Sequence, residues 1–90
     1  MLLDDVKTAL RLKTTAYDTE IVPMIEACKA DLRLAGVNVV SEADPLIQRA
    51  AIIYAKANFG SNPDSEKYQK SYEMLKASLA LAGDYNTVPT

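Results

Sequence analysis

Three isolated glycines divide this chain into helical segments. Gly36, Gly60 and Gly83 each follow a run of apolar residues at helical spacing. Glycine is favoured just past a helix C-terminus because it adopts positive φ without steric cost. Together with the start signals between the runs, they predict an all-α fold, a compact bundle of about four helices over residues 3–12, 19–35, 45–59 and 64–82. We expect one domain over residues 1–83 and a mobile C-terminal tail over residues 84–90.

Two of these segments carry a continuous apolar stripe. Steps of four and three residues place on one face Ile21, Ile25, Cys28, Leu32 and Ala35 in the second segment and Tyr68, Tyr72, Leu75, Leu79 and Ala82 in the fourth. Cys28 falls at the centre of its stripe, where a thiol packs as a small hydrophobe. Pro23 lies one residue beyond the free amides of a helix start, so we expect a distorted first turn or a slightly later start.

The third segment opens with Asp44-Pro45, an N-cap followed by proline at the first helical position. Its interior is apolar nearly all round, which predicts a nearly fully buried helix at the centre of the fold. Ile52 is the exception, because it falls in the polar sector between Arg49 and Lys56. It is either one of the isolated surface isoleucines that are normal in proteins or a contact with another polypeptide.

A second apolar line on the last segment holds Met74, Ala77 and Leu81. Either this helix lies deep between two others or part of it is an interface. Tyr85 and Val88 are apolar anchors in the tail that could become ordered when a partner binds. The candidate subunit or partner interface therefore comprises Arg49, Ile52, Lys56, Met74, Leu81, Tyr85 and Val88.

The composition excludes most enzyme chemistry. The 90 residues include no histidine and one cysteine, which leaves no Ser-His or Cys-His pair, no intrachain disulfide and no thiolate zinc cluster. The glycines stand too far apart for a phosphate-binding loop, and the carboxylates fall at exposed ends where nothing would raise their pKa. We therefore expect no enzyme activity, no catalytic residue, no metal, no cofactor and no small-molecule substrate.

The charges are few and dispersed. Ten basic and twelve acidic residues give a net charge of −2, without the concentrated positive face that nucleic-acid binding needs. The longest uncharged stretch, Leu34 to Ser41, is far too short to span a bilayer, so we expect no membrane partner. Asp4 and Asp5 stand where a secretory signal would carry positive charge, which favours a cytoplasmic site of synthesis.

A series of short motifs follows in order along the chain from Asp4 to about Leu81. They are Asp5-Val6-Lys7 with Leu10, Asp18 with Glu20-Ile21, Ile25 with Ala27, Ala30-Asp31-Leu32, Leu34-Ala35-Gly36-Val37, Asp44-Pro45-Leu46-Ile47, the block Ala50-x-Ile52-x-Tyr54-x-Lys56-Ala57-x-Phe59-Gly60, and Ser71-Tyr72 with Leu75. The order and spacing of these motifs resemble the small helical head-tail connector, or head-completion, proteins of long-tailed phages and prophages.

The resemblance implies a structural virion protein at the head-tail junction, present in the host cytoplasm during assembly. Its implied partners are further copies of itself in a ring, the portal protein above and the next tail-side connector or tail protein below, with DNA only as passing cargo. A closed head-to-tail ring needs two different patches, for which Ile52 with its basic neighbours and Met74 with Leu81 are the candidates. A small helical protein-interaction module and a DNA-binding regulator of phage or mobile-element origin remain alternatives.

Overall fold

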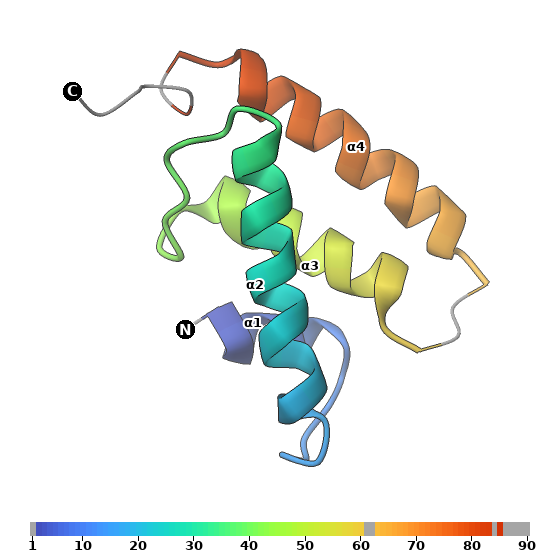
Figure 1. The fold of residues 1–90 in the computed structure, drawn as a ribbon. Helices are drawn as coiled ribbons and strands as arrows, with labels where there is room; N and C mark the ends of the chain where they lie inside the picture. The colour runs from blue at the N-terminus through green and yellow to red at the C-terminus, as the bar shows by residue number, and fades with distance from the viewer. Residues whose placement is uncertain (1, 61–62, 84, 86–90) are drawn as a thin grey trace.

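The computed structural model describes residues 2–60, 63–83 and 85, and Figure 1 shows their arrangement. Four helices form the fold: α1 (Leu2–Ala9), α2 (Asp18–Leu34), α3 (Pro45–Asn58) and α4 (Ser65–Leu81). The described residues contain no strand. The predicted all-α bundle is therefore confirmed, with helix ends that differ from the expected ones by at most three residues.

Two helix ends show how local chemistry sets the boundaries. After α2, Gly36 has φ +103°, its N–H donates to Arg33 O at 3.0 Å, and the Val37 N–H donates to Leu32 O at 2.9 Å. This is a Schellman motif, in which buried Leu32 and Val37 supply the usual apolar contact. Gly36 thus ends the helix as predicted.

The same motif ends α1, but around a non-glycine residue. Arg11 has φ +61°, and the Leu12 N–H donates to Lys7 O at 2.9 Å. The helix therefore stops at Ala9 instead of residue 12. No glycine marks this position in the sequence, and positive φ is uncommon for other residues.

The remaining helix boundaries agree with the sequence predictions only in part. Asp44 accepts a hydrogen bond from Leu46 N at 2.8 Å ahead of Pro45, which confirms the predicted start of α3. Helix α2 begins at Asp18, so Pro23 lies inside the helix and does not delay its start. At the end of α4, Ala82 is extended and Gly83 has no positive φ, so the expected glycine stop there is wrong.

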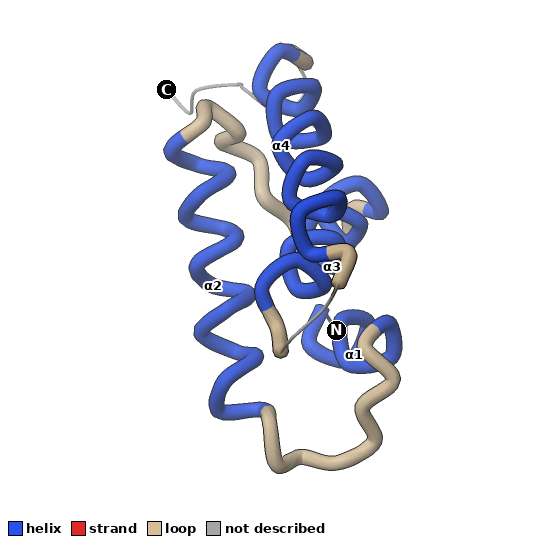
Figure 2. Tube along the Cα trace, turned by 90° about the vertical axis from the view of Figure 1, so that its right-hand side faces the viewer, coloured by secondary structure: helices blue, strands red, loops and turns tan. Residues whose placement is uncertain are grey.

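Helix α3 is the central element of the bundle, since it contacts each of the other three helices. Figures 1 and 2 show α1 and α4 at opposite ends of the molecule with α3 between them, and the molecule measures 41 × 25 × 18 Å. The core comprises Leu2, Val6, Ile21, Ile25, Cys28, Leu32, Val37, Ile47, Ala50, Ala51, Ala55, Tyr72 and Leu79. The two apolar stripes predicted for α2 and α4 supply most of its large side chains.

The third helix is less buried than expected. Its fully buried residues are Ile47 and three alanines, Ala50, Ala51 and Ala55, while Leu46 is 46% exposed. Because alanines contribute little volume, the larger side chains of α1, α2 and α4 fill the core around it. Helix α3 is therefore central because its small residues let the other helices approach it closely. The rest of the helix is partly exposed.

Candidate functional site

A polar cluster joins α2 to α4 beside the core. The Tyr72 hydroxyl donates to Asp31 Oδ2 at 2.7 Å, and Lys76 Nζ donates to the same oxygen at 3.0 Å. The Cys28 thiol lies 3.8 Å from the Tyr72 oxygen, and the Tyr72 ring packs edge-on against Tyr54 with centroids 5.1 Å apart. The contacts of Asp31 and Cys28 with α4 connect residues more than 40 positions apart in the sequence.

The electrostatics of this cluster favour a structural role. Burial raises the pKa of the Cys28 thiol to about 11. Burial and the hydrogen bond to Asp31 both raise the pKa of Tyr72. Burial alone would raise the pKa of Asp31, but the hydrogen bonds from Tyr72 and Lys76 outweigh it, so the pKa is lowered. Near neutral pH the cluster therefore holds a neutral thiol and phenol and an ionised carboxylate, with no activated nucleophile.

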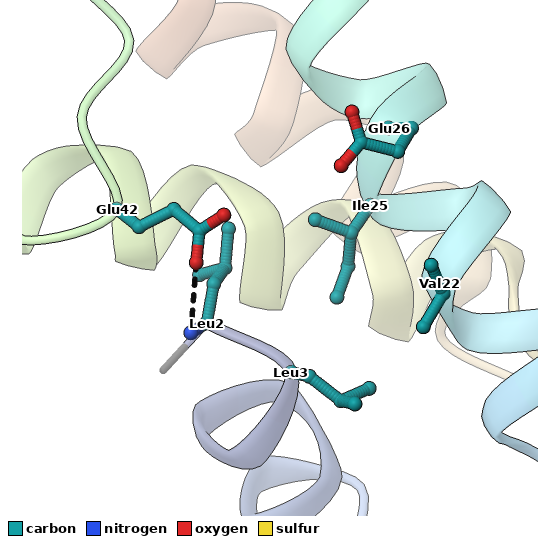
Figure 3. A pocket seen from close by; sticks show the side chains of 6 residues that line it. All are labelled: Leu2, Leu3, Val22, Ile25, Glu26 and Glu42. Atoms are coloured by element: carbon teal, nitrogen blue, oxygen red, sulfur yellow. Dashed lines mark hydrogen bonds between the residues drawn. The ribbon is translucent and has the colours of Figure 1, made fainter.

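A second cluster lies between α1 and α2. Glu42 accepts hydrogen bonds from the Leu2 N–H at 3.2 Å and from Lys29 Nζ, which hold the start of α1 against α2. Beside it, as Figure 3 shows, is an apolar pocket of about 200 Å³. Its lining residues are Leu2, Leu3, Val22, Ile25, Glu26 and Glu42.

The candidate interface residues of α3 are only partly on the surface. Arg49 is exposed, whereas Ile52 is half-buried and packs against the core. Lys56 is also half-buried, and its Nζ lies 5.6 Å from the centroid of the Tyr68 ring of α4. Helix α4 therefore lies along the sector that the helical wheel alone would assign to solvent.

The candidate residues of α4 are at the surface. Met74 is 72% exposed and Leu81 is 85% exposed. Of the two alternatives for this apolar line, burial between two helices is thus excluded for these side chains. Leu34, at the end of α2, is 88% exposed and was not among the candidates. Its exposure could have been predicted from the sequence, since Leu34 lies off the buried stripe that runs through Leu32.

Tyr85 takes a defined place in the fold. Its carbonyl oxygen accepts hydrogen bonds from Asn38 N at 2.7 Å and Val39 N at 3.1 Å, and its hydroxyl donates to Asp44 Oδ2 at 2.7 Å. Its side chain is half-buried against the core, so Tyr85 already has a partner inside its own chain. Val88 and the rest of the predicted tail lie outside the described residues.

The described residues contain no group of three potential metal-ligating side chains, and none of their helices is long and apolar enough to cross a membrane. A sequence model described as phage connector protein matches residues 2–86. Searches of curated proteins and of solved structures find no match. The match covers all four helices and Tyr85, so it extends to both clusters and to the exposed face of α4.

Proposed function

The chain belongs to the phage connector protein family, and we propose that it is a head-tail connector subunit that assembles as a ring beneath the portal. In this role it extends the DNA channel and provides a platform for tail attachment. The observation that carries the proposal is the family match over residues 2–86, which spans the whole helical bundle. Membership of this family supports a structural role in the virion.

The surface of the folded chain is suited to assembly. Leu34, Met74 and Leu81 are each more than 70% exposed, and all three are large apolar side chains on helices. A domain of this size buries a modest fraction of its apolar area by itself, and contacts between copies would cover more. The exposed face of α4 is therefore our first candidate for a subunit contact.

A closed ring requires two different patches on each subunit. We propose that one lies on α3 around Arg49, Ile52 and Lys56 and the other on α4 around Met74 and Leu81. Ile52 also packs against the core, so Arg49 and the exposed atoms of Ile52 and Lys56 would make most of the contact at the α3 patch. Tyr85 and Val88 are proposed to lie at the edge of the interface, where the fold places Tyr85 beside the N-terminus of α3.

The proposed partners are the portal protein, a tail-side connector or tail protein, and further copies of this chain. DNA is proposed only as passing cargo. The net charge of −2 supports this part of the proposal, because a channel wall without concentrated positive charge lets DNA slide without strong binding. The subunit is proposed to reside at the head-tail junction of the virion and to be present in the host cytoplasm during assembly.

The test is to mix the purified chain with a purified portal ring and image the product by electron microscopy. We expect an annular density beneath the portal. Leu81→Glu should prevent it, whereas Thr15→Glu, which adds the same charge at an exposed loop position, should not. Salt-dependent binding to duplex DNA, or a one-to-one complex with a host protein and no binding to the portal, would refute the proposal.

A further inference from the structure

The pocket between α1 and α2 has the size and chemistry of a receptor for one side chain. At about 200 Å³ it is smaller than the roughly 300–1,000 Å³ of small-molecule sites. Leu2, Leu3, Val22 and Ile25 make its wall apolar, and Figure 3 shows these side chains around one opening with Glu26 and Glu42 beside it. An unbranched or singly branched apolar side chain fits such a space.

The two glutamates give the pocket a negative rim. Lys29 Nζ contacts both Glu42 and, at 3.5 Å, the exposed Glu26. Glu42 makes the closer contact with Lys29, so Glu26, whose side chain is 63% exposed, is the rim carboxylate most available to a ligand. A fitting ligand is an apolar side chain with a cation about one helical turn away.

The exposed face of α4 presents this combination. Lys67, Lys70 and Met74 line one surface at steps of three and four residues, so they follow one line along the helix. Within the described parts of the chain, Lys67 and Lys70 make no ion pair. Asp64 and Glu66 lie on the same surface near the start of the helix, with Glu66 one turn from Lys70 and two turns from Met74.

The two surfaces cannot meet within one molecule. Figures 1 and 2 show α4 at one end and α1, which forms part of the pocket wall, at the other. We infer that Met74 of one copy inserts into the pocket of the next, with Lys70 facing Glu26 and Glu42. The contact joins different patches and repeats head to tail, which is the arrangement that can close into a ring.

This inference rests on the proposed function, because it identifies two faces of the proposed ring. It also differs from the α3 patch proposed above in placing the receptor surface on α1 and α2. Methionine suits the inserted position, since its flexible thioether adapts to an irregular apolar pocket. Lys70 would orient the inserted helix by pairing its ammonium group with the carboxylates at the rim of the pocket.

The test compares the assembly of full-length variants by sedimentation velocity, for the chain alone and on a purified portal ring. Met74→Glu and Val22→Glu should each raise the concentration needed for assembly by about tenfold or more, as for the central residues of an interface. Glu26→Lys and Lys70→Glu should each weaken assembly, and the double variant should restore it, because the pair is then reversed. Thr15→Glu should assemble as the native chain does, and circular dichroism checks that each variant folds.

Two results would overturn the inference while the proposed function survives: the native chain assembles and Val22→Glu assembles equally well, or the reversed charge pair restores nothing. Loss of assembly in Met74→Glu but not in Val22→Glu would also overturn it, since Met74 would then contact a surface other than this pocket, such as the α3 patch proposed above. If the native chain assembles neither alone nor on the portal ring, the proposed function fails and the inference fails with it.

Discussion

Removal of the Tyr72 hydroxyl tests whether the polar cluster between α2 and α4 stabilises the fold. Tyr72 is fully buried, and its hydroxyl donates to the ionised Asp31 at 2.7 Å. Hydrogen bonds to charged groups contribute roughly 1.5–3 kcal/mol. The Asp31 side chain is 37% exposed and keeps its contact with Lys76, so water can replace the lost donor. We therefore expect Tyr72→Phe to lower the free energy of unfolding by about 1.5 kcal/mol, at the low end of that range.

The assay is urea denaturation at pH 7 followed by circular dichroism. A loss of this size corresponds to a fall in Tm of roughly 6–12 °C for a domain of this length. Tyr68→Phe is the matched control, because Tyr68 is half-buried on the same helix and Lys56 still contacts its ring after the change. A double-mutant cycle with Asp31→Asn should give a coupling energy of about 1 kcal/mol.

The effect should also depend on pH. The pKa of Asp31 lies below its ordinary value of 3.8 in the folded chain, so its ionised form stabilises the fold above that value and the stabilisation is lost as the pH falls below it. Without the Tyr72 donor this pKa rises, so the gap between the native chain and Tyr72→Phe should narrow on acidification. A change below about 0.5 kcal/mol at pH 7, or a gap that stays constant down to pH 3, would refute the reasoning.

Three further predictions concern single sites. Gly36→Ala should lower the free energy of unfolding by about 1–2 kcal/mol, because φ +103° disfavours a Cβ, whereas Gly83→Ala should be nearly neutral; equal effects in urea titrations would contradict the Schellman assignment. Cys28 should react with a thiol reagent at pH 8 only when the chain unfolds, since burial raises the pKa of its thiol to about 11, and rapid labelling of the native chain would show an accessible thiol. Glu42→Gln should lower the amide-exchange protection factors of α1 because the hydrogen bond and ion pair to Lys29 weaken. The bond from Lys29 lowers the pKa of Glu42, so acidification of the native chain below pH 4.5 should also lower these protection factors, and unchanged protection factors would show that Glu42 does not hold α1.

Helix boundaries could be predicted where the responsible groups are neighbours in the sequence. Asp44-Pro45 starts α3 and Gly36 ends α2, because the cap atoms and the amides they satisfy are within a few residues. The end of α1 could not be predicted in this way. Arg11 adopts positive φ without any residue type that signals it, while Leu12 packs against the core.

The candidate interface shows the same division. The apolar line on α4 could be found from periodicity, and Met74 and Leu81 are indeed exposed. Ile52 was placed in the polar sector of its helix, but the fold half-buries it against the core, and Lys56 in the same sector contacts Tyr68 of α4. A helical wheel gives the direction of a side chain and leaves open which neighbouring helix covers it.

The sequence alone determined the number of helices, the stripes that supply the buried residues of α2 and α4, and the absence of histidine and paired cysteine chemistry. These features depend on residue type and on spacings of a few residues. The tertiary structure decided the contacts among Tyr72, Asp31 and Lys76, the place of Tyr85, and the pocket beside Glu42. Each of these brings together groups from separate segments of the chain, as far apart as Asn38 and Tyr85. No local pattern encodes such a contact, because it forms only when the packing of α3 against the other helices sets their relative positions.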